Sequence, residues 1–273
     1  MRNLISLFTF HFSLFTFHFS LFTFMLLAVD IGNTNIKLGV FDAERIVFKL
    51  SLPALRDLTS DALSKALRPR LTQNITSAIV CSVVPEIDPA MDQFIAGEYE
   101  VKPIFVSNDF DFGLNINYEP LSAVGTDRLV NSFAAAEKYG VPCVVCSFGT
   151  ATTIDVIDAK RELLGGLIAP GIQTMSAALR LMTSKLPEVE MQKPVTILGN
   201  TTIESIRSGI YFSQLGLVES AVARITDEIG TKPVVVATGG FANEIATDTK
   251  IIEIVDDLLT LDGLRMLYLR KSS

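Results

Sequence analysis

Three short polar segments of this sequence combine residue types that bind phosphate or move protons. The first follows an apolar run and contains Asp30, Gly32, Asn33, Thr34, Asn35 and Lys37. A glycine turn lets backbone amides approach phosphate oxygens, while an aspartate at a strand end can hold Mg²⁺. The segment therefore predicts a phosphate site in which Asp30 is the Mg²⁺ ligand. It lacks the spacing of a Walker loop, and a tight turn that only reverses the chain explains it equally well.

The second segment offers hydroxyl groups beside a glycine, at Gly149, Thr150 and Thr152. It lies in the second half of the chain, in the place that corresponds to the first turn. Together the two turns predict the opposing jaws of a phosphate clamp. Gly239 and Gly240 follow the apolar run PVVVAT and are expected to lie against an adenosine. The alternative is structural, because threonine-rich strands are common and a glycine pair after a strand usually marks only a turn.

The third segment, Gly125-Thr126-Asp127-Arg128, opens a predicted helix over residues 126–139. A carboxylate in the first turn of a helix is favoured by the helix dipole, which keeps it ionised and available as a base. The adjacent arginine can form paired hydrogen bonds with a carboxylate or phosphate. The histidines stand only at positions 11 and 18, so Asp127 is the expected proton acceptor. From these four residues alone, a helix cap with a solvated arginine is the simpler interpretation.

Apolar patterns place these segments on a fold of repeated α/β units. The chain from Met25 predicts three antiparallel strands, MLLAVDIG, IKLGVFD and RIVFKLSL. Further elements are expected as a helix at 60–67, a strand at 77–84, a helix near 85–95 and a strand at 103–107. The second half begins again with the strands CVVCSFG, TIDVID and ELLGGLIAPG. After these come a helix following Gly171, a long amphipathic helix over 203–225, the strand PVVVATGG and a helix at 261–269.

The two strand triplets are similar, with an offset of roughly 117 residues between their turns. In each, an apolar strand runs to a residue-x-Gly turn, and the next strand ends in aspartate, at Asp42 and Asp158. This repetition predicts a duplicated unit and two similar domains that face each other across a cleft. The expected divisions are an N-terminal repeat at 1–24, a first domain at 25–141 and a second domain at 142–273.

The first 24 residues differ from the rest of the chain. From Ser6 they read SLFTFHF, SLFTFHF, SLFTF, which places Phe and Leu on every face of a helix. The segment lacks the cleavage site of a signal peptide, and Ser, Thr and His interrupt it as a membrane span. So perfect a repeat indicates a translated upstream DNA repeat, and we expect synthesis to start at Met25. An intact-mass measurement on the native protein tests this expectation.

Composition excludes several classes of function. The 273 residues carry a net charge of −7 and a pI near 5.0, which argues against a nucleic-acid partner and for a small molecule. Three cysteines, Cys81, Cys143 and Cys146, are too few for a disulfide framework, so a cytoplasmic location without a membrane partner is expected. Cys143 and Cys146 lie three apart in a strand, hence on opposite faces, which favours core packing over a metal site.

Taken together, the motifs resemble those of type III pantothenate kinases. The matching segments, in the same order, are DIGNTNIK, VGTDR, GTATTIDV, GGLIAPG, KLP, LGNTTIESIRSGI and ATGG. The resemblance runs from Met25 almost to the C-terminus. It implies an α/β fold of the acetate and sugar kinase/actin superfamily, with two ribonuclease H-like domains and an interdomain ATP cleft. It also implies a homodimer that transfers the γ-phosphoryl group of ATP to pantothenate, giving 4′-phosphopantothenate, the first step of coenzyme A biosynthesis.

The resemblance also implies roles for individual residues. Asp30 matches the acidic residue associated with Mg²⁺ and the phosphates, and Asp127 matches the proposed base that deprotonates the primary hydroxyl of pantothenate. Substrate contacts are implied at Tyr118, Gly125, Thr126, Arg128 and Thr202, the last contributed across the dimer interface. The ATP site is implied at Asp30, Gly32, Asn33, Thr34, Asn35, Lys37, Gly149, Thr150, Thr152, Gly239 and Gly240.

One position departs from the family pattern. Many members have an aspartate immediately before x-Gly-Thr-Ala-Thr-Thr, where it helps to hold a monovalent cation, and here this residue is Ser147. A neutral hydroxyl cannot supply the same charge, so we expect a weaker K⁺ or NH₄⁺ site, or none. Two other functions stay open: a kinase for another small hydroxylated metabolite, and a non-catalytic ATP-binding regulatory relative. Asp30 and Asp127 argue against loss of catalysis, and Ser147 argues for it.

Overall fold

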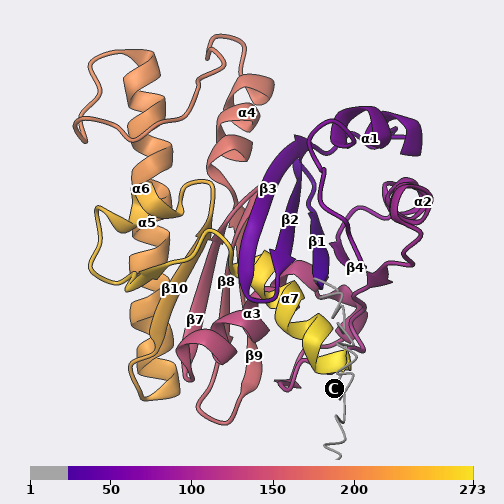
Figure 1. The fold of residues 1–273 in the computed structure, drawn as a ribbon. Helices are drawn as coiled ribbons and strands as arrows, with labels where there is room; N and C mark the ends of the chain where they lie inside the picture. The colour runs from indigo at the N-terminus through magenta and orange to yellow at the C-terminus, as the bar shows by residue number, and fades with distance from the viewer. Residues whose placement is uncertain (1–23, 273) are drawn as a thin grey trace, which may run out of the picture.

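The computed structural model describes residues 24–272. Two mixed β-sheets lie beside each other, with helices packed on both (Figure 1). The first sheet comes from the N-terminal part of the chain, coloured indigo to purple, and the second from the later part, coloured magenta to orange. The predictions made for the N-terminal repeat concern residues 1–24, of which residues 1–23 lie outside the described part of the chain.

The first sheet has the strand order β3-β2-β1-β4-β5. Its strands are β1 (Met25–Ile31), β2 (Asn35–Asp42), β3 (Arg45–Pro53), β4 (Ser77–Ser82) and β5 (Ile104–Phe105). The first three form an antiparallel meander, while β4 and β5 continue the sheet in parallel on the other side of β1. Because β1 is a central strand buried on both faces, its sequence is apolar at every position except Asp30 rather than alternating.

The second sheet repeats this plan, with the strand order β11-β10-β7-β8-β9-β6. Its strands are β6 (Asn115–Ile116), β7 (Cys143–Phe148), β8 (Ala151–Ile157), β9 (Glu162–Pro170), β10 (Val234–Gly239) and β11 (Ile254–Val255). β7, β8 and β9 form the meander, and β10 and β11 run parallel to β7 on its other side. Both sheets therefore contain a three-strand meander, as the repeated sequence pattern predicted.

Helices connect the strands and cover the sheets. They are α1 (Ser60–Leu67), α2 (Asp88–Tyr99), η1 (Leu121–Ala123), α3 (Thr126–Tyr139), α4 (Ile172–Met182), α5 (Thr202–Ile229), α6 (Ala242–Ala246) and α7 (Leu259–Ser272). The predicted bounds of α1 and α3 are confirmed. The prediction for α2 began too early, because a turn in which Ile87 N donates to Val84 O precedes the helix. The prediction for α7 was too short, because Asp256 accepts a hydrogen bond from Leu258 N and starts the helix sooner.

A shared hydrophobic core joins the two sheets. Helices α3 and α7 pack in one cluster with Leu26 and Cys81 of the first sheet and with Cys143 of the second. Although α7 is last in the chain, it contacts β1 and β4. The approach of α7 to α3 requires Gly263, since a Cβ there would lie 2.8 Å from Val130 Cγ1. β6 crosses in the other direction, so each half contributes an element to its neighbour.

The three cysteines lie in the hydrophobic cores. Cys143 packs in the shared core, whereas Cys146 packs in a separate cluster with α5, so the two thiols do face opposite sides of β7. Both are free and buried, as is Cys81. Across residues 24–272, no helix has the length and apolar character needed to span a membrane.

Candidate active site

A cavity of about 350 Å³ is lined by residues of both halves of the chain. Its walls are the turn between β1 and β2, the turn between β7 and β8, the start of α3 and the end of β10. The predicted site residues that line it are Asp30, Gly32, Asn33, Thr34, Asn35, Lys37, Asp127, Arg128, Ser147, Gly149, Thr150, Gly239 and Gly240. The three segments that the sequence singled out therefore meet in one place.

The first turn carries a pair of opposite charges. Asp30 near the end of β1 is directly across from Lys37 on β2. Asp30 is only 8% exposed, and this burial raises its pKa to about 6, an effect that Lys37 opposes and Asp127 reinforces. Gly32 N donates to Asn35 O over 3.0 Å and closes the turn. The segment thus places a carboxylate and an ammonium group next to a compact glycine turn.

The second turn faces the first and touches it. Gly149 N donates to Ala151 O over 3.0 Å, which gives the same type of closure as in the first turn. The hydroxyl oxygens of Thr34 and Thr150 lie 2.7 Å apart and share a hydrogen bond. The carbonyl of Thr150 also accepts from Gly171 N and from Thr174 Oγ1. The backbone of the second turn is therefore held by α4, and its hydroxyl reaches across the cavity.

Asp127 lies in the first turn of α3 and lines the cavity. Its Oδ1 accepts a hydrogen bond from Arg128 N over 2.8 Å. A Cβ at position 125 would lie 2.4 Å from Asp127 Oδ1, so a residue larger than Gly125 would displace the carboxylate. Burial raises the pKa of Asp127, and the Arg128 N–H only partly offsets this. The helix terminus was expected to favour the ionised form of Asp127, and desolvation works against this effect and exceeds that of the backbone donors.

Arg128 turns its guanidinium toward the second sheet. Its Nε and Nη2 bind the carboxylate of Asp155 on β8, with Nη2 to Oδ1 at 2.5 Å. The two side chains are buried, and the guanidinium carbon lies 5.5 Å from the centre of the Tyr118 ring. Tyr118 thus reaches the site through Arg128 rather than by lining the cavity.

Four other predicted residues also stay outside the cavity lining: Gly125, Thr126, Thr152 and Thr202. Thr126 is buried, and its hydroxyl donates to Ser82 O over 3.0 Å. Thr152 is fully buried and donates to Gln214 Oε1 over 2.6 Å. Neighbouring residues of a strand point to opposite faces, so Thr153 lines the cavity and Thr152 does not.

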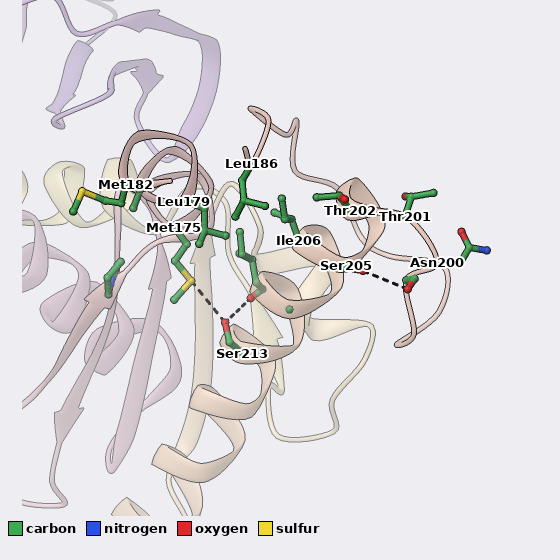
Figure 2. A pocket seen from close by; sticks show the side chains of 15 residues that line it. Met175, Leu179, Met182, Leu186, Asn200, Thr201, Thr202, Ser205, Ile206 and Ser213 are labelled. Carbon is green, nitrogen blue, oxygen red and sulfur yellow. Dashed lines mark hydrogen bonds between the residues drawn. The ribbon is translucent and has the colours of Figure 1, made fainter. Parts of the chain in front are cut away.

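Thr202 lines a second and larger pocket of about 920 Å³, between α4 and the start of α5 (Figure 2). Apolar side chains of Met175, Leu179, Leu186 and Ile206 form its floor, and the hydroxyls of Thr202 and its neighbours form one rim. Close to it, Leu181 and Met182 at the end of α4 are 83% and 79% exposed. This region is an apolar surface that the described chain leaves uncovered.

Several cavity residues were not predicted from the sequence. Thr238 on β10 pairs with Ser147 across the sheet, and both line the cavity. Asn131 and Thr260 share a hydrogen bond of 2.7 Å that joins α3 to α7 at the cavity wall. A signal was available for Asn131, which lies one helical turn after Asp127 and so on the same face. The role of Thr260 depends on the packing of α7, which no local pattern reveals.

The donor set suits a magnesium ion carried by a nucleotide. Among the residues that the structure describes, no group of three or more His, Cys, Asp or Glu side chains could hold a metal ion. Mg²⁺ is usually bound by one or two carboxylates together with phosphates and water. Asp30 and Asp127 line the same cavity and raise the negative potential there, which a divalent cation would relieve. The site therefore fits Mg²⁺ with ATP phosphates rather than a protein-only metal centre.

Sequence comparisons give a consistent family. Residues 26–224 match the sequence model of the family described as type III pantothenate kinase. A type III pantothenate kinase of Koribacter versatilis is 40% identical over 269 residues, with 91% of this chain and 97% of that protein covered. The match extends through both glycine turns and the start of α3, so it includes most of the cavity lining.

Comparisons of structure agree on the fold. A Campylobacter jejuni protein named for the Baf family of transcriptional activators has a TM-score of 0.59 at 19% identity, covering 90% of this chain and 98% of its own. MreB5 of Spiroplasma citri, solved with ADP, has a TM-score of 0.51 at 10% identity, covering 91% and 97%. At such low identity these likenesses show the fold alone. They confirm the predicted actin-like and sugar-kinase fold class.

Proposed function

Because the chain belongs to the type III pantothenate kinase family, we propose that it carries out its reaction in the cavity between the two turns, with Asp127 as general base. The reaction is the ATP-dependent phosphorylation of pantothenate in coenzyme A biosynthesis. One observation supports this placement above the others. Asp30, Asp127 and the two glycine turns line a single cavity, although they come from three separate segments of the chain.

In the proposed mechanism, Asp127 accepts the proton of the primary hydroxyl of pantothenate as the hydroxyl oxygen attacks the γ-phosphorus of ATP. The bond between that phosphorus and the β,γ-bridging oxygen breaks, and ADP leaves. A carboxylate with a raised pKa is a better proton acceptor near neutral pH than an ordinary aspartate. The two turns hold the phosphates through backbone amides and hydroxyls, and Lys37 adds positive charge. Asp30 would hold Mg²⁺, which neutralises phosphate charge when it is bound. Positioning and charge neutralisation supply most of the acceleration in phosphoryl transfer.

The assignment of the base is tested by Asp127→Asn, with ADP release measured in the presence and absence of pantothenate. We expect ATP binding to be retained and turnover to fall by roughly 10²–10⁴-fold, the usual contribution of general-base catalysis. Glu137→Gln is the matched control, since Glu137 stands on the same helix but pairs with Arg161 outside the cavity. Turnover of Asp127→Asn equal to that of the control would remove Asp127 from this role.

We further propose that the apolar surface around the second pocket is the interface of a homodimer. Its support is the exposure of Leu181, Met182 and Leu198, the last 84% exposed, next to a pocket whose floor is apolar. Exposed apolar patches of this kind usually mark interaction sites. Thr202 on the rim would then meet substrate bound to the partner copy. Met182→Glu should yield monomers in analytical ultracentrifugation, whereas Leu55→Glu, at an exposed apolar site elsewhere, should not.

For the monovalent cation we propose a weak site or none. Ser147 lines the cavity between Thr153 and Thr238 on the neighbouring strands, so its surroundings supply hydroxyl oxygens rather than a carboxylate. Hydroxyls can coordinate K⁺, but they do not add the negative charge that would attract it. Equal turnover in K⁺ buffer and in buffer free of K⁺ and NH₄⁺ is expected. Strict dependence on either ion would contradict the proposal.

The cellular location is proposed from the cysteines. All three are free and buried, with Cys81 and Cys146 deep in the cores. A protein that keeps reduced thiols and uses ATP fits a reducing compartment, so we propose that this protein works in the cytoplasm. Fractionation of native cells with an antibody against the protein tests this location.

A further inference from the structure

Asp155 is a buried aspartate that was not identified from the sequence. It contacts Arg128 on α3, the helix that carries the proposed base. We propose that Asp155 is a positioning residue, which fixes Arg128 and thereby sets the distance between Asp127 and the second phosphate turn. The proposal rests on the proposed function of Asp127. In this role Asp155 makes no contact with the substrate. It affects catalysis through Arg128.

The strand that carries Asp155 is itself firmly held. β8 lies between β7 and β9, and Asp155 pairs in register with Val145 on one side and Gly166 on the other. β9 approaches so closely at this point that a Cβ on Gly166 would lie 2.0 Å from Ile154 O. Ile154 and Asp155 alternate, so Ile154 packs in the cluster with α5 while Asp155 faces α3. Asp155, 1% exposed, is thus a charge anchored in the middle of a sheet.

The contact between Asp155 and Arg128 defines an orientation. Arg128 Nε lies 3.0 Å from Oδ1 and 3.2 Å from Oδ2, and Nη2 lies 2.5 Å from Oδ1. A planar guanidinium bound through two of its nitrogens cannot rotate, in contrast to a lysine held through one. The Tyr118 ring lies on the guanidinium at 5.5 Å and limits its movement further. Arg128 is therefore fixed in both position and plane.

Stability alone does not account for this pair. Burial of two charges costs desolvation energy that their attraction often fails to recover, and apolar pairs of the same volume commonly stabilise a fold as well or better. An ion pair differs from an apolar contact in being directional. The benefit of the Asp155–Arg128 pair is therefore best sought in the geometry that it imposes on its neighbours.

Those neighbours are the two reacting parts of the site. Arg128 follows Asp127 directly, and its backbone N–H donates to the carboxylate of Asp127 over 2.8 Å. Asp155 follows Thr150 by five residues along β8, a distance of about 16 Å in an extended strand. The ion pair is thus a direct side-chain link between the segment that holds the base and the strand that begins at the phosphate turn. Loss of this link removes the directional contact that sets the position of the start of α3 relative to the turn.

The test uses the full-length protein with two changes at position 155. Asp155→Asn keeps the shape of the side chain and removes its charge, while Asp155→Glu keeps the charge and moves it by one methylene. A displacement of about 1 Å can lower turnover roughly 10²-fold, so we expect a loss of that order in kcat for Asp155→Asn. The Kd for ATP should change by less than about threefold, because neither turn loses a phosphate contact.

Asp256→Asn is the matched control. Asp256 is also buried and accepts from Lys138 Nζ over 2.6 Å, at the opposite end of α3 and about 15 Å along the helix from Arg128. Both neutralised variants should unfold at lower temperature than the parent protein. Only Asp155→Asn should lose kcat per folded molecule, which separates positioning from general destabilisation.

Each outcome of this experiment distinguishes a positioning role of Asp155 from a purely stabilising one. Normal kcat in folded Asp155→Asn would overturn the positioning role, even if its thermal stability fell. If that variant fails to fold, Asp155→Glu supplies the answer, because a retained charge with roughly tenfold lower kcat supports positioning and unchanged kcat overturns it. Loss of activity in Asp155→Asn with normal activity in Asp127→Asn would instead overturn the base assignment, and with it the positioning of that base.

Discussion

The two phosphate turns have the same place in their sheets and a different chemical character. In the first sheet, Asp30 stands two residues before the turn glycine and is flanked by Lys37 on β2 and Cys81 on β4. In the second sheet, Ser147 stands two residues before its glycine and is flanked by Thr153 and Thr238. The first turn is charged, and the second presents hydroxyl groups.

This difference indicates that two similar turns can contribute different chemistry to one site. The two sheets carry similar turns that meet through the Thr34–Thr150 hydrogen bond. Charge is concentrated on one side, where Asp30 and Lys37 would meet the ion and the phosphates. The neutral side can approach the same phosphates without adding repulsion. Four predictions, taken from the largest expected effect to the smallest, test whether the two turns contribute differently.

Removal of the charge from the first turn should have the largest effect. Asp30→Asn is expected to lower kcat by roughly 10²–10³-fold, since neutralisation of phosphate charge by a held metal ion is worth several kcal/mol. Steady-state ADP release at saturating Mg·ATP and pantothenate measures the loss. The comparison variant is Ser147→Ala in the second turn, for which we expect a change of less than about fivefold. Equal losses in the two variants would mean that the turns do not divide the chemistry.

The same substitution should stabilise the metal-free protein. Burial raises the pKa of Asp30 from 3.8 to about 6, so the folded state binds its proton more tightly than the unfolded state does. The ionised form therefore destabilises the fold above pH 6, by up to about 3 kcal/mol. Asp30→Asn should be more stable than the parent at pH 7 in EDTA, and this advantage should vanish as the pH falls from 6 to below 4. Urea unfolding at several pH values measures it, and a difference independent of pH would contradict it.

Addition of a charge to the second turn should change its response to cations. In Ser147→Asp, we expect activity to become K⁺-dependent, with roughly tenfold higher activity in K⁺ than without it, because a carboxylate attracts a cation that hydroxyls do not. Turnover measured over a K⁺ titration tests this, with Na⁺ at constant ionic strength as the reference. Ser147→Asn, which adds an oxygen ligand without charge, should stay insensitive to K⁺ and so separates charge from coordination.

Loss of the hydrogen bond between the two turns should have the smallest effect. A double-mutant cycle with Thr34→Val and Thr150→Val should give a coupling free energy of about 1 kcal/mol or less, as for a single neutral hydrogen bond at an accessible site. Urea unfolding of the four proteins without nucleotide provides the values. A coupling well above this range would show that the two halves are locked together rather than lightly joined.

Much of the fold followed from local patterns in the sequence. Continuous apolar strands and turn glycines identified the two triplets, and apolar spacing gave the bounds of α3. The turns containing Asp30 and Gly149 could be selected as candidate phosphate sites because their residue types stand at the strand end itself, and both turns do line the cavity. Position within a single element was enough for these assignments.

The rest depended on contacts between distant segments. Asp155 looks like an ordinary polar residue of a strand, and its partner Arg128 stands 27 residues earlier. Thr152 and Thr153 are the same residue type at adjacent positions, so the sequence does not distinguish them. Only the folded structure shows which side of β8 faces the cavity. Strand alternation could have shown that both cannot line one site, but not which of the two does. Burial likewise decides the pKa of Asp127, and burial is a property of the assembled fold.

The placement of α7 has a consequence for the synthesis of the protein. Because the last helix packs on β1, β4 and α3, the core around the N-terminal sheet can close only after residue 259 has left the ribosome. The N-terminal sheet therefore keeps an apolar face exposed while the second half of the chain is synthesised. Long-range closure of this kind is slow, so a stop codon before α7 should yield chains that aggregate or are degraded. A tag is therefore better placed at the beginning of the chain than fused tightly to its end.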